Sequence, residues 1–202
     1  MSNLRVLLTG ATGYIAGQLL PAFRENYDLR MIDVRDTDGS GKRVEGVEVL
    51  DLLSADETGL APLFSGVDAV VHCGHSKPEG DEPRTQYEGE RRNLDMMQRV
   101  YQLSLEHGVE RVVAASTNQA AKWYENPYYA GLKDRVDPED YPRPDSFYGW
   151  AKAAWEPLGF LYACGSLGQK LEKEERRVEQ HPRENGQDLP RARRPRRGDR
   201  GP

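Results

Sequence analysis

The chain has 202 residues and a net charge of −5, but residues 1–168 carry 17 basic and 26 acidic side chains whereas residues 169–202 carry 11 and 7. An acidic body argues against a nucleic-acid partner, and no apolar run approaches the length of a membrane span. The two cysteines are too few for a disulfide framework or a cysteine zinc site. We therefore expect a cytoplasmic protein with no membrane partner and no bound metal.

Apolar residues recur with two spacings, which predict strands and helices in turn. The expected strands are 4–9, 29–34, 47–50, 68–72 and 111–115, and the expected helices are 14–26, 60–64, 85–107 and 147–165. Pro21 weakens the second half of the first helix and Pro157 interrupts the last one. The proline-containing segment 120–146 is expected to be a long irregular loop, of the kind that is usually functional. Alternating strands and helices favour an α/β fold with a doubly wound parallel sheet.

The segment from Thr9 to Ala16 follows the first strand and opens the first helix. Gly10 permits a tight turn, Gly13 lets the backbone approach a pyrophosphate, and the small Ala16 permits close packing of helix on strand. Free N–H groups at the start of a helix bind phosphates well. These features predict a Rossmann dinucleotide-binding unit whose cofactor contacts are Gly10, Ala11, Thr12, Gly13, Tyr14 and Ile15.

One acidic residue stands at the end of the second strand and another just past the third. Asp33 could accept both ribose hydroxyls of NAD and would repel the 2′-phosphate of NADP, although the neighbouring Arg35 partly offsets that repulsion. The structural alternative is that Asp33 only starts a turn. Asp51 could contact the adenine, or it could cap the next helix.

Tyr148 and Lys152 stand four residues apart, so on a helix they share one face. An ammonium beside a phenol stabilises the phenolate, and Tyr148 could then exchange a proton with a substrate hydroxyl. Lys152 would also hold the nicotinamide ribose. A hydroxyl at the end of the fifth strand could steady charge on the substrate oxygen, with Thr117 preferred over Ser116, although both could merely cap a turn.

The residues Thr9 to Ala16, Asp33, Ser116-Thr117 and Tyr148 to Lys152 resemble the NAD-dependent epimerase/dehydratase family, the extended short-chain dehydrogenases, over residues 3–168. Asn118-Gln119 and the segment 143–146 look more like the branch of uronate dehydrogenases and related sugar-phosphate dehydrogenases. The resemblance implies that Thr117 is the catalytic hydroxyl and that the substrate contacts are Ser76, Ser116, Asn118 and Gln119. It also implies a small-molecule sugar substrate, NAD as cofactor and, for many members, a homodimer.

Three positions depart from that branch. Gln119 replaces the usual histidine, Tyr87 stands where an asparagine is usual, and the segment between Thr117 and Tyr148 is longer. These changes indicate a different substrate choice, an altered proton relay and a different lid.

We expect one domain over 1–168, which binds NAD and carries the Tyr-x-x-x-Lys helix, followed by a charged tail over 169–202. The tail has almost no large apolar residues, so it is expected to be disordered rather than a basic arm for nucleic acid. The family pattern leads us to expect a sixth apolar strand near Leu167, but the sequence there shows no such strand. This favours a truncated or frame-shifted reading of a longer gene over a natural short paralogue. The expected function is sugar or sugar-acid oxidation with NAD; the alternatives are a sugar-nucleotide epimerase or dehydratase, and a non-catalytic NAD-binding protein.

Overall fold

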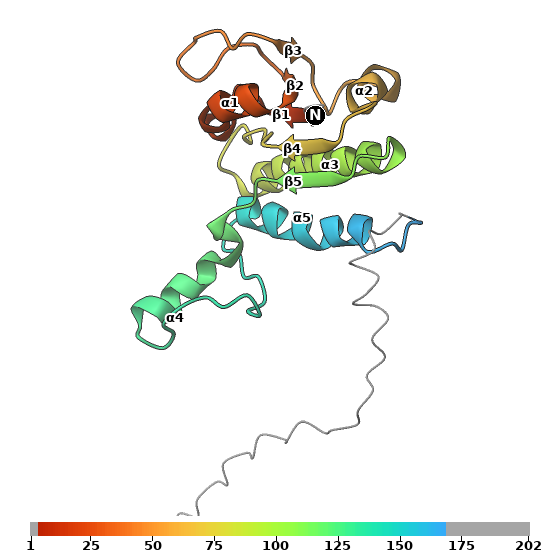
Figure 1. Cartoon of the computed structure of the whole chain (residues 1–202). Helices are drawn as coiled ribbons and strands as arrows, with labels where there is room; N and C mark the ends of the chain where they lie inside the picture. Colours follow the sequence, from red (N-terminus) through yellow and green to blue (C-terminus); the bar gives the residue numbers. More distant parts are fainter. Residues whose placement is uncertain (1–3, 169–202) are drawn as a thin grey trace, which may run out of the picture. The chain divides into compact units, whose positions relative to one another are not determined.

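The computed structural model describes residues 4–168, and the predicted tail at 169–202 lies outside the described residues. Strands and helices alternate along the chain except that β3 follows β2 directly and three helices follow β5, as Figure 1 shows. The strands are β1 (Arg5–Thr9), β2 (Asp28–Asp33), β3 (Val47–Val49), β4 (Ala69–His72) and β5 (Arg111–Ala114). The helices are α1 (Tyr14–Asn26), α2 (Glu57–Phe64), α3 (Pro83–Glu106), the 3₁₀ helix η1 (Asn118–Tyr124), α4 (Glu125–Tyr129) and α5 (Phe147–Ala163).

Within the described residues the strands form one parallel sheet in the order β3-β2-β1-β4-β5. Thr9, the last residue of β1, pairs with Ile32 on one side and with His72 on the other, and His72 pairs with Ala114. The carboxyl ends of β1, β2, β4 and β5 therefore meet at the same edge of the sheet. This topology confirms the predicted α/β fold, and ligands of such sheets bind at this edge.

Neighbouring residues of β1 point to opposite faces of the sheet, and each face has its own buried cluster. Leu7 and Val70 pack against α2, α3 and Trp155 of α5, whereas Leu8 packs against Ala16 and Leu20 of α1. The helices thus cover both faces, which explains why these strands are apolar runs rather than alternating ones.

Two details of the sequence prediction are corrected. Helix α5 is not interrupted at Pro157, because the buried side chain of Trp155 anchors it on the sheet. Helix α1 has the predicted bounds and runs through Pro21. The segment 120–146 is not irregular throughout, since η1 and α4 occupy its first part. Among residues 4–168, no helix has the length and apolar character needed to cross a membrane.

The segment after β5 is stabilised by aromatic and cationic side chains from its own two ends. The guanidinium of Arg143 lies 4.9 Å from the centre of the Trp123 ring, and the amide of Trp123 donates to the carbonyl of Arg143 at 3.0 Å. The hydroxyl of the buried Tyr124 donates to the carbonyl of Tyr141 at 3.0 Å. These contacts tie η1 to the chain just before α5, and so they position the start of the helix that carries Tyr148.

Candidate active site

The turn from β1 into α1 has the backbone that the glycine pattern predicted. Gly10 has a φ of 69°, and a Cβ atom there would lie 2.5 Å from the amide nitrogen of Gly74, so only glycine fits. Gly13 precedes the first residue of α1, and no side chain caps the helix there. Ala16 is fully buried against the sheet. The N–H groups at the start of α1 are therefore available for a ligand, as a phosphate site requires.

Asp33 is tied to this glycine turn. Its Oδ2 accepts hydrogen bonds of 2.8 Å from both the amide and the hydroxyl of Thr12, and its Oδ1 accepts one of 2.7 Å from the amide of Val34. The carboxylate thus has a fixed position at the end of β2, beside the helix start, and it keeps lone pairs for further donors.

A cavity of about 520 Å³ opens at this edge of the sheet, within the usual size range of small-molecule sites. Its walls include Gly10, Thr12, Gly13, Tyr14, Ile15, Asp33 and Asp51 from the predicted cofactor set, and His75 and Ser76 from the loop after β4. Asp51 accepts from the amide of Leu53 and the hydroxyl of Ser54, so it closes a turn. It does not cap α2, because Asp56 does so by accepting from the amide of Gly59.

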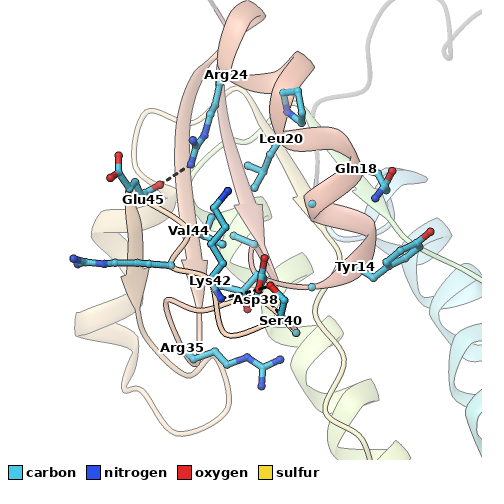
Figure 2. Close-up of a pocket in the computed structure, with 17 residues that line it drawn as sticks. Tyr14, Gln18, Leu20, Arg24, Arg35, Asp38, Ser40, Lys42, Val44 and Glu45 are labelled. Carbon is cyan, nitrogen blue, oxygen red and sulfur yellow. Dashed lines mark hydrogen bonds between the residues drawn. The ribbon is translucent and has the colours of Figure 1, made fainter.

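A second cavity, of about 830 Å³, lies on the other side of the glycine turn, between α1 and the segment 35–46 (Figure 2). Arg24, whose Nη2 donates to the carbonyl of Glu45 at 2.7 Å, and Lys42 line it together with Asp38. Arg35 lines both cavities. Arg35 thus brings a cationic side chain to the cavity that Asp33 lines, which bears on the choice between NAD and NADP.

Helix α5 begins at a well-defined cap. The Ser146 hydroxyl accepts from the amide of Gly149 at 3.2 Å, and Gly149 packs directly on the carbonyl of Gln119. A side chain on Gly149 would collide with that carbonyl, so the glycine between Tyr148 and Lys152 allows α5 to lie against η1. The Tyr-Gly-x-x-Lys pattern thus has a packing reason as well as a chemical one.

Lys152 is 3% exposed, and its Nζ donates to the carbonyl of Ala115 at 2.8 Å. The same Nζ lies 3.6 Å from the centre of the Trp155 ring and 5.8 Å from that of the Tyr148 ring. Burial lowers the pKa of Lys152 to about 8, while the charges of Glu90 and Cys73 oppose that change. The ammonium is held between the end of β5 and Tyr148, where it can stabilise a phenolate.

The two hydroxyls after β5 have different partners. Ser116 donates to Oε1 of Glu156 in α5 at 3.0 Å, and the hydroxyl of Thr117 accepts from the amide of Gln119 at 3.2 Å and so caps η1. The Gln119 side chain accepts from the hydroxyl of Ser146 at 3.3 Å, and Asn118 is exposed. These predicted residues lie together beside α5. They do not line the 520 Å³ cavity, and neither does Tyr148. The link between the two groups is His75, which lines the cavity and has its ring centre 5.0 Å from that of Tyr148.

The loop after β4 adds residues that the motifs did not mark. Lys77 and, from α3, Arg92 bring positive charge to the 520 Å³ cavity. The buried Asn93 holds the backbone of Ser76 at both ends, accepting from its amide at 2.8 Å and donating to its carbonyl at 2.9 Å. Only the place of Asn93 on the apolar face of the predicted helix could have marked it, because its partner is a backbone group.

His72 is a core residue. It is fully buried, and its Nδ1 lies 2.6 Å from the hydroxyl of Thr9. Burial, together with the charges of Lys152 and His75, lowers its pKa to about 3, so the imidazole is neutral near pH 7. Residues 4–168 contain no group of three His, Cys, Asp or Glu side chains that could hold a metal ion.

Known proteins resemble this chain in sequence and in fold. A model of the NAD dependent epimerase/dehydratase family matches residues 6–163. An NAD-dependent glucose-6-phosphate dehydrogenase from Haloferax volcanii is 33% identical over 167 residues, which cover 78% of this chain and 62% of that protein. A uronate dehydrogenase from Pseudomonas syringae pv. tomato is 31% identical over 159 residues, 78% of this chain and 54% of that protein.

A solved structure titled MoeE5 in complex with UDP-glucose and NAD is 30% identical, with a TM-score of 0.61, and the match covers 79% of this chain and 49% of that one. The chain thus spans about half to three-fifths of the length of the relatives it matches.

Proposed function

The chain belongs to the NAD dependent epimerase/dehydratase family, and we propose that it is an NAD-dependent oxidoreductase that oxidises a sugar or a sugar acid. The observation that carries this proposal is the buried Lys152, held by the end of β5 with its ammonium 5.8 Å from the ring of Tyr148. A buried lysine is costly to keep, and its place beside a tyrosine at the ligand-binding edge of the sheet suits acid–base chemistry. The relatives named as sugar and uronate dehydrogenases support the same substrate class.

The residues of the glycine turn fit NAD. The start of α1 offers N–H groups of Tyr14 and Ile15 to the pyrophosphate, and Asp33 would accept the hydroxyls of the adenosine ribose. Asp51 would face the adenine, and Lys152 would hold the nicotinamide ribose. When bound, NAD supplies the acceptor for the hydride that leaves the substrate carbon.

The protein's own groups would then handle the proton. Tyr148 as a phenolate would take the proton of the substrate hydroxyl, and the ammonium of Lys152 would stabilise that phenolate. The hydroxyl of Thr117, or that of Ser116, would donate to the substrate oxygen. Ser76, Asn118 and Gln119 would contact the rest of the sugar and so select it.

Two measurements test the proposal. Calorimetry on the full chain should show NAD binding that Asp33→Ala weakens, because the variant loses the acceptor for the ribose. A panel of aldoses, uronates and sugar phosphates should contain a compound that reduces NAD, and Tyr148→Phe should lower kcat at least about 100-fold without loss of NAD affinity. NAD binding with no reduction by any compound would instead favour a non-catalytic NAD-binding protein.

The second candidate is a sugar-nucleotide epimerase or dehydratase, which the structural similarity to a protein solved with UDP-glucose and NAD favours. The same chain, loaded with NAD and given UDP-glucose, separates the two. An epimerised or dehydrated product without net NADH would support this candidate, whereas net NADH formation would support the dehydrogenase.

A further inference from the structure

Helix α3 carries a carboxylate that is buried although no part of the proposed mechanism uses it. Glu90 is 1% exposed, and its Oε1 and Oε2 lie 3.0 and 3.2 Å from Nε2 of His75. Oε2 also accepts a hydrogen bond of 3.0 Å from Nδ2 of Asn93. A carboxylate that is buried without a partner is strongly destabilising. Glu90 therefore requires the hydrogen bond that Nε2 of His75 donates to it.

The other side of His75 faces the candidate active site. The imidazole lines the 520 Å³ cavity, and its side chain is 26% exposed. Its ring centre lies 5.0 Å from that of Tyr148, with the two rings nearly perpendicular at 86°. Asn93 fixes the next residue of the loop, Ser76, at both backbone groups. The imidazole is therefore held between a buried carboxylate and Tyr148, with access to solvent.

The contact with Glu90 also decides which nitrogen is basic. An ionised carboxylate only accepts hydrogen bonds, so Nε2 of His75 must carry a proton. In the neutral ring Nδ1 is then the acceptor, and it has no hydrogen-bond partner among residues 4–168. A carboxylate that orients an imidazole in this way prepares the opposite nitrogen to take up a proton, as in the hydrolase triads.

The titratable side chains around His75 come from three elements and one loop: Glu90 in α3, Tyr148 and Lys152 in α5, His72 in β4, and Cys73 and Lys77 in the loop after it. His72 stays neutral because burial lowers its pKa to about 3, and burial raises the pKa of the Cys73 thiol. The charge of Lys152 balances that of Glu90. His75 is therefore the group in this cluster that both contacts the ring of Tyr148 and has access to solvent.

We propose that His75, with its Nε2–H held by Glu90, takes the proton that Tyr148 receives from the substrate and passes it to water. This role rests on the proposed oxidation, in which the hydrogen on the substrate carbon leaves as hydride to NAD and the hydroxyl hydrogen leaves as a proton. That proton moves from the hydroxyl of Tyr148 to Nδ1 of His75, directly or across one water, and then to solvent. Tyr148 returns to the phenolate, and Nε2 keeps its proton throughout.

Three variants of the full chain test the proposal. His75→Gln removes the base, Glu90→Gln removes the charge but keeps the shape, and Glu88→Gln is the control, because Glu88 lies on the surface of the same helix, paired with Arg84. With a sugar that the wild type oxidises, His75→Gln should lower kcat at least about tenfold and leave KM unchanged. One ionisation should also disappear from its kcat–pH profile. In Glu90→Gln that ionisation should move to lower pH, and in Glu88→Gln nothing should change.

A second measurement needs no substrate. NMR of the chain with ¹⁵N-labelled histidine should show that His75 takes up its proton at a lower pH in Glu90→Gln than in the wild type, because an adjacent opposite charge favours the imidazolium. The control variant should match the wild type. An unchanged titration in Glu90→Gln, or a wild-type kcat–pH profile in His75→Gln, would overturn the proposal. If the wild type oxidises no sugar, the proposed function fails and the relay with it, even where NMR shows the pair.

Discussion

Replacing Lys152 by methionine should stabilise the folded chain near neutral pH, although the proposed chemistry depends on this lysine. Burial lowers the pKa of Lys152 from 10.5 to about 8. Since one pKa unit corresponds to about 1.4 kcal/mol, keeping the ammonium buried costs about 3 kcal/mol of unfolding free energy. Methionine fills similar space but loses the hydrogen bond to the carbonyl of Ala115 and the cation–π contact with the Trp155 ring, each worth about 1 kcal/mol. The expected net gain is about 1 kcal/mol.

The gain should depend on pH with a definite sign. Between pH 8 and 10.5 the unfolded chain still holds the Lys152 proton while the folded chain has released it, so wild-type stability gains a contribution as pH rises through this window. Lys152→Met has no such contribution, and its advantage should shrink from pH 7 to pH 10.

Urea unfolding of the wild type, Lys152→Met and the exposed Lys77→Met control at both pH values measures the effect. A lower unfolding free energy of Lys152→Met than of the wild type at pH 7 would refute the reasoning.

Three further predictions concern the glycine turn and its neighbours. Gly10→Ala should lower the melting temperature, because Gly10 has a φ of 69° and a Cβ would lie 2.5 Å from the amide nitrogen of Gly74. The control is Gly17→Ala on α1, where a Cβ meets open space, and it should stabilise the fold by up to about 1 kcal/mol. The wild type should lose stability as pH falls from 6.5 towards 3, because in this range His72 binds a proton in the unfolded chain but not in the folded one. In urea unfolding, His72→Gln should lack this part of the loss of stability in acid. In calorimetry, Asp33→Asn should weaken NAD binding more than NADP binding. The reason is that the substitution removes the charge that repels a 2′-phosphate, while nearby cations remain. An equal loss of affinity for both cofactors would argue against that role for Asp33.

The features that the sequence predicted well depend on local chemistry. Val6, Leu7 and Leu8 are apolar because both faces of β1 are buried, and Gly10 is a glycine because its φ is positive. The spacing of Tyr148 and Lys152 likewise requires only a helix, and α5 supplies it. Each of these inferences needs no knowledge of distant parts of the chain, which is why the fold class could be predicted from one sequence.

The structure of the segment 118–146 could not be predicted in the same way. Its helices η1 and α4 are stabilised by contacts across the segment, such as Arg143 over the ring of Trp123 and the hydrogen bond from Tyr124 to Tyr141. The prolines in this segment suggested a loop, and periodicity carries no information about a cation stacking on an aromatic ring twenty residues away. The continuation of α5 through Pro157 is similar, because Trp155 anchors the helix on the sheet.

The buried pair of Glu90 and His75 lies between these two cases. Glu90 follows the spacing of the buried residues Asn93, Met97 and Val100 on α3, so the sequence places an acid on the apolar face of a predicted helix. Such a position requires a partner, because an ionised carboxylate buried alone is too costly. The sequence cannot identify that partner, since His75 reaches Glu90 only when the loop after β4 is fixed, and the residue that fixes it is Asn93. An acid on an apolar helix face is therefore evidence for a buried polar pair, and the partner becomes evident only from the fold.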